Sequence, residues 1–329
     1  MRPMAASKPV VQSKPAVQSR HAESANIIEI IDPHVHLFAL EHGQYHWLKS
    51  DNPPYWPDKA LINKSFTADS LHLSEPLTLR GYVHIEAGFD NQQPCAELAY
   101  LEKHSSIPPF NTIAGCDLTL PSEEFATQIK SLTQHASCVG VRHILDDQAL
   151  SLLACPRVLA NLSYLDAQGL LFEAQFDVTD TQVVDRIWHL FMHDSSSNTE
   201  PLPLTHTWVI NHVGLGSMNE SSVCQWQQNL ARLAAIPSIK VKASGWEMAD
   251  REYNFAQVKQ TLSILLEVFG DKRVMLASNF PLTLFSCSYQ TYWENIVTAL
   301  QELTESHALN STTQRALLLQ NALDTYFPR

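Results

Sequence analysis

Short apolar runs alternate with amphipathic stretches along most of the chain. Eight runs have the length of buried β-strands, at residues 27–31, 81–86, 112–116, 139–144, 170–175, 208–211, 239–243 and 274–277. Apolar positions at helical spacing occupy residues 95–104, 123–134, 156–167, 181–193, 221–235, 255–269, 289–303 and 312–326. In the stretch 289–303, for example, Tyr289, Trp293, Ile296 and Leu300 share one helical face.

This alternation predicts an α/β fold, and eight strand–helix repeats predict a closed (β/α)8 barrel, or TIM barrel. The rival fold is an open doubly wound sheet that binds a dinucleotide through a glycine-rich turn after its first strand. The first strand is followed instead by Asp32-Pro33-His34-Val35-His36. We expect one barrel domain over residues 26–329, a long first loop over residues 38–78 at one end of it, and a flexible polar tail over residues 1–25.

Composition narrows the classes of partner. The 329 residues include 22 Lys and Arg against 34 Asp and Glu, a formal charge of -12, which argues against nucleic acid as a partner. No run of eighteen apolar residues exists, and the N-terminal tail lacks the apolar core of a signal peptide, so we expect a cytoplasmic protein without a membrane span. The six cysteines form no C-x-x-C pair and are expected to be reduced.

Polar residues stand at the carboxyl ends of most predicted strands, where barrel active sites form. These candidates are Asp32, His34, His36, Glu86, Arg142, His143, Gln175, His212, Lys242, Ser244, Ser278 and Asn279. His34 and His36 are two residues apart in extended chain, so both imidazoles project to one side and could grip one cation or one substrate. A third ligand is required, for which His212, Glu86 and Gln175 are available; the neutral Asn279 is a poorer ligand than a carboxylate, so a tightly held metal is not assured.

The same segments resemble a known family. IIDPHVHLF at residues 30–38, YHWL at 45–48, HIEAG at 84–88, GVRHIL at 140–145, NHVG at 211–214, KASG at 242–245 and LASNFP at 276–281 are similar to the sugar-lactone and pyrone-dicarboxylate lactonases of the amidohydrolase superfamily. Seven such motifs in the same order over some 300 residues are specific for this group. They do not identify the substrate. The resemblance implies a TIM barrel that opens small lactones, in some members with a divalent metal and in others without.

The resemblance assigns roles to three histidines and reveals one departure. It implies that His34 and His36 bind a metal, zinc or manganese, or polarise the lactone carbonyl, and that His212 is the sixth-strand histidine. Many members carry an aspartate as general base on the eighth strand, where this chain has Asn279. An amide cannot accept a proton at neutral pH. His212 is the preferred substitute and Glu86 the other; alternatively, Asn279 orients water that a metal acidifies, or hydrolysis has been lost.

Other residues are candidates for binding the substrate. Arg142 could clamp a carboxylate, but strand alternation prevents Arg142 and His143 from both facing the interior. Lys242 could stabilise an oxyanion or extend to solvent, and Gln175 ends the fifth strand. Tyr45 and Trp47 lie in the long first loop, where aromatic side chains could cover the barrel mouth and a sugar ring.

The leading hypothesis is a hydrolase that opens a sugar-acid or dicarboxylate lactone, a small-molecule substrate. The alternatives are a metal-dependent decarboxylase or amidase on the same barrel, and a binding protein that has lost the catalytic base. Copies of the chain could also associate through the outward faces of their helices to form a homo-oligomer. Periodicity alone does not distinguish such an interface from a core-facing stripe.

Overall fold

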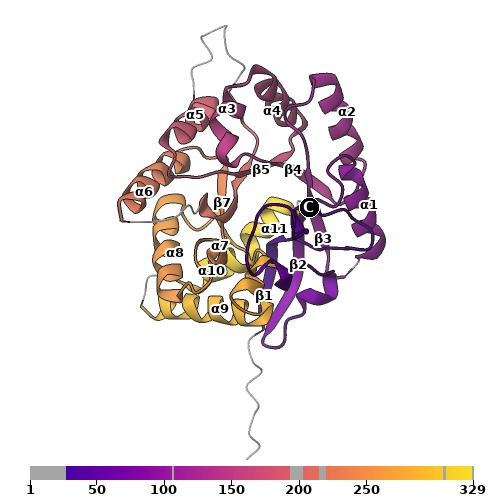
Figure 1. The fold of residues 1–329 in the computed structure, drawn as a ribbon. Coiled ribbons are helices and arrows are strands. Elements are labelled where there is room, and N and C mark those ends of the chain that lie inside the picture. Colours follow the sequence, from indigo (N-terminus) through magenta and orange to yellow (C-terminus); the bar gives the residue numbers. More distant parts are fainter. Residues whose placement is uncertain (1–26, 106, 193–202, 215–219, 307–308, 328–329) are drawn as a thin grey trace, which may run out of the picture.

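The fold is a ring of eight parallel strands surrounded by helices (Figure 1). The computed structural model describes residues 27–105, 107–192, 203–214, 220–306 and 309–327. The strands lie side by side in chain order: β1 (Ile28–Val35), β2 (Leu77–Ile85), β3 (Phe110–Gly115), β4 (Cys138–Ile144), β5 (Leu171–Gln175), β6 (Trp208–Ile210), β7 (Ile239–Ala243) and β8 (Val274–Leu276). Past β8, Val35 bridges Phe280 and the His36 amide donates to the Phe280 carbonyl at 2.6 Å, which closes the ring. The expected TIM barrel is confirmed.

Helices follow the strands, and most of them cover the outside of the barrel (Figure 1). They are α1 (Pro94–His104), α2 (Ser122–Leu132), α3 (Ala149–Ala154), α4 (Pro156–Gln168), α5 (Thr181–Met192), α6 (Glu220–Ala234), α7 (Trp246–Ala249), α8 (Phe255–Phe269), α9 (Tyr289–Glu305), α10 (Ser311–Arg315) and α11 (Asn321–Tyr326). None of these described helices is long and apolar enough to cross a membrane.

The last helical segment plugs the amino-terminal end of the barrel. A π-helical turn, Ala316–Gln320, joins α10 to α11, and Figure 1 shows α11 within the ring of strands. Asn111 at the start of β3 donates to the Tyr326 carbonyl, and Lys240 at the start of β7 donates to Thr325. Tyr326 packs with Val83, Ile113 and other strand side chains in a small interior core. The barrel floor is therefore closed by the chain's own C-terminal segment.

Several boundaries differ from those expected from the sequence. β1 continues through Asp32 to Val35, because these residues still pair with Tyr82 and His84 of β2. β2 begins four residues earlier than expected, and the short helices α3 and α7 were not anticipated. The expected helix over residues 312–326 is interrupted by the π-helical turn. The expected tail over residues 1–25 lies outside the described residues.

A buried lysine organises the long loop between β1 and β2. The loop holds three short 3-10 helices, at His46–Leu48, Lys59–Leu61 and Ala68–Leu71. Lys59 is buried, and its ammonium donates to the carbonyls of Trp47, Lys49 and Asn52 at 2.9, 3.1 and 2.7 Å. Three charge-assisted hydrogen bonds compensate the desolvated cation and fix the turn that carries Trp47.

Candidate active site

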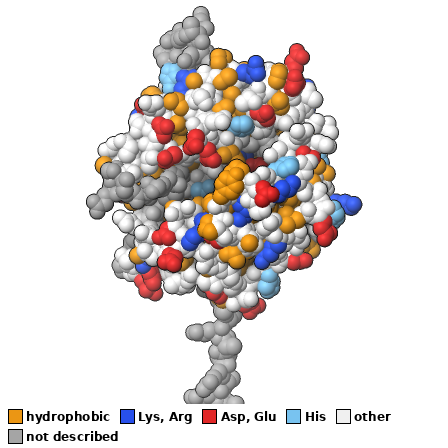
Figure 2. All heavy atoms as spheres, in the orientation of Figure 1, with side chains coloured by type: hydrophobic (Ala, Val, Ile, Leu, Met, Phe, Trp, Pro, Cys, Tyr) orange, Lys and Arg blue, Asp and Glu red, His pale blue; other side chains and the backbone are white. Residues whose placement is uncertain are grey.

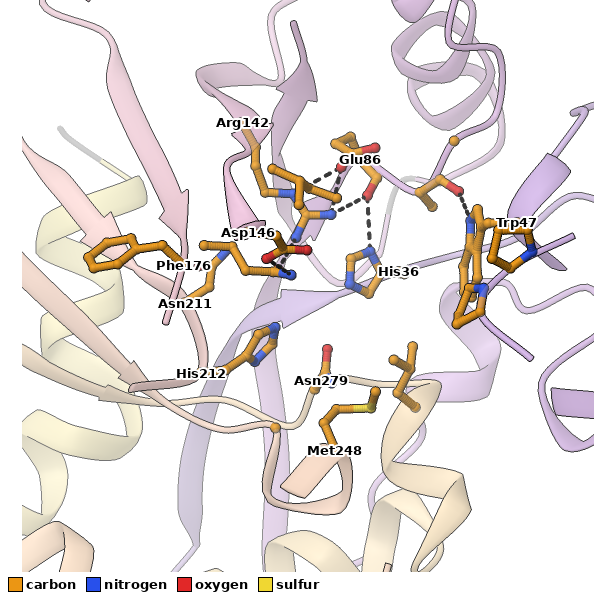
Figure 3. Close-up of a pocket in the computed structure, with 18 of the residues that line it drawn as sticks. His36, Trp47, Glu86, Arg142, Asp146, Phe176, Asn211, His212, Met248 and Asn279 are labelled. Carbon is orange, nitrogen blue, oxygen red and sulfur yellow. Dashed lines mark hydrogen bonds and ion pairs between the residues drawn. The ribbon is translucent and has the colours of Figure 1, made fainter. Parts of the chain in front are cut away.

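A pocket of about 950 Å³ lies at the carboxyl ends of the strands. Its lining comes from strand ends and from the loop after β1, and includes His36, Trp47, Trp56, Glu86, Arg142, Asp146, Asp147, Gln175, Phe176, Asp177, Asn211, His212, Met248 and Asn279. Figure 2 shows the hollow near the middle of that face, with acidic side chains beside it, and Figure 3 shows the labelled residues converging on it. This is the place where barrel enzymes bind their substrates.

The two histidines of β1 form a hydrogen-bonded pair. His34 is fully buried, and its Nε2 lies 3.2 Å from Nε2 of His36. His36 Nδ1 lies 2.9 and 3.1 Å from the carbonyl oxygens of Ile85 and Glu86, which accept only, so Nδ1 carries the proton. His36 Nε2 then accepts from His34 Nε2, and His34 Nδ1 accepts from Lys242 Nζ at 3.3 Å. One consistent set of neutral tautomers satisfies the pair.

Below this pair lies a buried ion pair. Lys242 Nζ is 2.5 Å from Glu173 Oε1, which also accepts from the Tyr326 hydroxyl at 2.7 Å. None of the three side chains reaches solvent. Burial lowers the pKa of Lys242 to about 8 against the opposing effect of Glu173. Burial, reinforced by nearby cations, also holds the pKa of His34 well below its ordinary value, so its imidazole stays neutral.

His212 faces the pocket from a strained turn after β6. Its φ is 55°, and the next residue, Val213, has φ 53°, a conformation rarely adopted by a β-branched residue. Such strain persists where the surrounding structure imposes it and is typical of functional sites. His212 Nδ1 lies 3.1 Å from Ser244 Oγ. Burial, with Arg142 and Lys242 nearby, lowers the pKa of His212 to about 3, so the imidazole is neutral at pH 7.

Arg142 and Glu86 form an ion pair on the opposite wall (Figure 3). Arg142 Nε and Nη2 donate to Glu86 Oε1 at 2.9 and 2.6 Å, and Nη2 also donates to the Glu86 carbonyl at 3.0 Å. Oε1 of Glu86 is therefore occupied by two N–H donors of Arg142, whereas His212 has no such ion pair among the described residues, and the pairing leaves the charge of Arg142 largely neutralised.

Asn279 contacts a carboxylate that the sequence analysis did not single out. Asn279 follows β8 with φ 58°, a left-handed conformation that asparagine tolerates. Its Nδ2 donates to Oε1 of Glu247, in α7, at 2.6 Å. Glu247 has no exposed surface, and burial raises its pKa to about 7 although the Asn279 bond opposes the shift.

The remaining candidates divide between the pocket and the surrounding structure. Arg142 faces the pocket, whereas His143 turns away, as strand alternation requires, with its Nδ1 3.0 Å from the Cys116 carbonyl. Gln175 and Trp47 line the pocket, and the Trp47 indole donates to the Ala87 carbonyl at 2.7 Å. Tyr45 is buried outside the pocket lining, and its hydroxyl accepts from the Ala39 amide. Lys242 lies beneath the floor rather than in solvent or at the mouth.

The histidine pair meets only part of what a metal would require. The 3.2 Å between the two Nε2 atoms is close to the roughly 3.3 Å that two nitrogens span around a tetrahedral zinc. A metal-binding histidine, however, donates its other N–H to a carboxylate or carbonyl, and His34 Nδ1 faces the Lys242 ammonium instead. Glu173 Oε2, at 4.0 Å, is beyond hydrogen-bond reach. Among the described residues, no three His, Cys, Asp or Glu side chains form a metal-holding group. The donor set does not fit a resident metal.

Comparison with known proteins decides the family. The family model described as Amidohydrolase matches residues 31–327. The chain belongs to the amidohydrolase family. An uncharacterised protein of Sinorhizobium fredii is 25% identical over 91% of this amidohydrolase and 98% of its own length. An L-fucono-1,5-lactonase of Burkholderia multivorans is 23% identical over 79% of this chain and 84% of its own. A Burkholderia multivorans amidohydrolase solved with bound zinc has a TM-score of 0.71 at 20% identity, over 91% of this chain and 99% of its own.

Two buried carboxylates of this amidohydrolase site were missed by the sequence analysis. Glu173 lies inside β5, between apolar residues, and the hydrogen bond that it accepts from the distant Lys242 gives no local signal. Glu247 lies two residues beyond the KASG motif, in a four-residue helix that the apolar pattern does not reveal. A charged residue inside an otherwise apolar strand was the only available indication of Glu173, because such residues are buried only when paired.

Proposed function

We propose that this amidohydrolase hydrolyses the ester bond of a small uncharged lactone, such as the 1,5-lactone of a sugar acid. The observation that carries the proposal is the pairing of a neutral imidazole, His212, with an amide oxygen, that of Asn279, on the wall of one pocket. A proton acceptor and a hydrogen-bond acceptor directed at the same space suit the activation of a water molecule. The similarity to an L-fucono-1,5-lactonase supports the choice of substrate class.

The proposed reaction begins with attack by water on the lactone carbonyl carbon. His212 takes one proton from that water as the new C–O bond forms. The lowered pKa keeps His212 neutral before the reaction, and negative charge developing on the substrate raises its proton affinity as the bond forms. Arg142 retains N–H groups beyond those that bind Glu86 and stabilises the carbonyl oxygen as it becomes anionic.

Collapse of the tetrahedral intermediate opens the ring. The endocyclic C–O bond breaks, and the His212 imidazolium returns its proton to the leaving alkoxide oxygen, which becomes the hydroxyl of the product. The product carboxyl group ionises and releases one proton to solvent, which an indicator dye detects. No step uses a metal, in keeping with the environment of His34 Nδ1.

The charges around the pocket support an uncharged substrate over a dicarboxylate. The described lining residues include four carboxylates, Glu86, Asp146, Asp147 and Asp177, and a single guanidinium, Arg142. Because Glu86 already neutralises Arg142, a pyrone dicarboxylate would bring two negative charges into an acidic pocket. The aromatic faces of Trp47 and Trp56 in the same lining suit the apolar face of a sugar ring.

The test is acid release from a panel of lactones. We expect turnover of L-fucono-1,5-lactone or another uncharged sugar 1,5-lactone, little or none of 2-pyrone-4,6-dicarboxylate, and no loss of activity in the presence of a chelator. His212→Gln should lower kcat by about 100-fold or more. Preference for the dicarboxylate would contradict the charge argument. A lactone that raises the melting temperature without being opened would indicate a binding protein instead.

A further inference from the structure

The turns after β7 and β8 bring a carboxylate and an amide together at the edge of the pocket. Glu247 in α7 has no exposed surface, and Asn279 is 1% exposed. Glu247 Oε1 accepts the only hydrogen bond found for the Asn279 side chain within the described residues, from Nδ2 at 2.6 Å. Figure 3 shows the other end of the amide, its oxygen, directed between His36 and His212.

Two polar atoms of this pair are buried without a protein partner. They are Oδ1 of Asn279, which is directed into the pocket, and Oε2 of Glu247. A buried oxygen without a hydrogen bond is costly, and such atoms in a native protein require a partner such as an ordered water or a ligand group. The Asn279 oxygen is therefore a prepared acceptor for an O–H group in the pocket.

Within the described part of the chain, no cation hydrogen-bonds to the Glu247 carboxylate, and Arg251 acts on it only as a nearby charge that lowers its pKa. Arg251 donates to the Glu247 main-chain carbonyl, and its Nε donates to Asp58 at 2.7 Å, so its hydrogen bonds go elsewhere. The other titratable groups that interact with Glu247 are uncharged near neutral pH: Tyr253, Cys287 and Tyr292. The N–H of Asn279 is thus the main hydrogen bond that stabilises the ionised carboxylate.

We propose that Glu247 is a positioning residue that fixes the side-chain amide of Asn279, so that the amide oxygen faces the pocket and holds the attacking water. An ionised carboxylate can only accept hydrogen bonds, so it requires the NH2 end of Asn279 and leaves the oxygen to the pocket. The role of the water rests on the lactone hydrolysis proposed above. A buried carboxylate on α7 thereby compensates for the absence of one at residue 279.

The protonated form of Glu247 would lose this effect. A protonated carboxyl group has one O–H donor and one carbonyl acceptor, so it no longer enforces one orientation of Asn279, and the amide is free to turn over and present NH2 to the pocket. An NH2 group cannot accept a hydrogen bond from water. Since burial raises the pKa of Glu247 to about 7, activity should fall as the pH drops below neutral.

The activity test exchanges the two groups. Glu247→Gln leaves two amides in contact, with neither orientation enforced, and should lower kcat about tenfold, leave KM little changed and remove the loss of activity below neutral pH. The double variant Glu247→Gln/Asn279→Asp restores an amide donor and a carboxylate acceptor in reversed positions and should recover kcat. Glu252→Gln, the same change at an exposed residue five positions away, is the control. Equal kcat and pH profiles for Glu247→Gln and Glu252→Gln would overturn the proposal.

A second measurement does not depend on turnover. In protein labelled with ¹⁵N-asparagine, the Asn279 side-chain signal is assigned by its loss in Asn279→Asp. We expect this signal to shift with pH through neutrality in the wild type and in Glu252→Gln, and to be insensitive to pH in Glu247→Gln. A signal that does not move in the wild type would overturn the positioning role. If no lactone is opened but the signal titrates, the proposed function fails and the coupling of Glu247 to Asn279 stands.

Discussion

Gly245 shows how one residue without a side chain shapes the active site. It ends the KASG motif with φ +76°, and a Cβ placed on it would lie 2.7 Å from Nδ1 and 2.8 Å from Cγ of His212. No side-chain atom fits at that distance without displacing the imidazole. The glycine therefore sets how closely the turn after β7 can approach the proposed proton acceptor.

We predict that Gly245→Ala impairs catalysis more than stability. The added methyl group should push His212 from its position and lower kcat/KM about 100-fold, because misplacement of a reacting group by an ångström is that costly. Gly169→Ala is the matched control, since Gly169 also has a positive φ, of 65°, but nothing within 4 Å of the added Cβ. Both variants lose some thermal stability because alanine disfavours a positive φ, and Gly245→Ala should lose more because it also displaces the imidazole. Equal kcat/KM values for the two variants would show that the contact with His212 is unimportant.

Site residues could be predicted from the sequence where they stand in or after a predicted strand. They could not be predicted where their place in the site depends on packing between distant segments. His36 and His212 were identified because they follow apolar runs and Arg142 because it interrupts one, and the structure brings the three to one pocket. The strand pattern shows that Arg142 and His143 face opposite sides. It does not show which of the two faces the interior. The partner of Asn279 was missed because burial of Glu247 results from the contact between two turns 32 residues apart.

At the scale of elements, strands were predicted better than the segments that connect them. A strand buried on both sides is a continuous apolar run, and β7 was predicted at the observed residues. β2 starts earlier because Leu77, Thr78 and Leu79 pair with β1, and long-range pairing leaves no mark in the local pattern. The helix α7 has four residues, about one helical turn, which is too short for a repeating hydrophobic stripe to be recognised.

The loop between β1 and β2 is the element whose role can be tested independently of the chemistry. Lys59→Gln removes the ammonium that binds three carbonyls and should loosen the turn carrying Trp47. We expect a rise in KM of about tenfold with little change in kcat, because Trp47 contacts the pocket and takes part in no proton transfer. The comparison is Lys49→Gln, which changes an exposed lysine of the same loop. A fall in kcat at constant KM would contradict this assignment.

At the scale of the whole molecule, the buried titratable groups act on stability in opposite directions. Burial lowers the pKa values of His34, His36 and His212 in the folded protein. Below their ordinary value of 6.5, the unfolded chain binds protons that the folded protein does not, so the free energy of unfolding falls as the pH drops. Glu247 and Asp32 have raised values, of about 7 and about 6, so they reduce stability as the pH rises toward neutrality. Three histidines oppose two carboxylates, so the histidines dominate below pH 6.5, and the net contribution of these five groups falls as the pH drops further.

Glu247→Gln isolates one of these contributions. Between the ordinary value of 4.5 and the folded value of about 7, the folded wild type binds more protons than the unfolded chain, so rising pH destabilises it. The variant lacks this titration. The melting temperature of the variant minus that of the wild type should increase between pH 4.5 and 7 and stay constant above pH 7. The increase corresponds to about 3 kcal/mol in the free energy of unfolding. A difference that is constant with pH would show that Glu247 titrates normally in the folded protein.

The contact between Tyr326 and Glu173 has a consequence for the order of events in the cell. Tyr326 is synthesised after all eight strands, yet its hydroxyl shares the carboxylate that binds Lys242, and Lys242 in turn donates to His34. A nascent chain with a complete ring of strands would still lack the plug that excludes water from this ion pair. The protein would therefore gain its final arrangement of histidine protons only once Tyr326 has been synthesised and packed, so that a product truncated before Tyr326 could fold in part without acquiring activity.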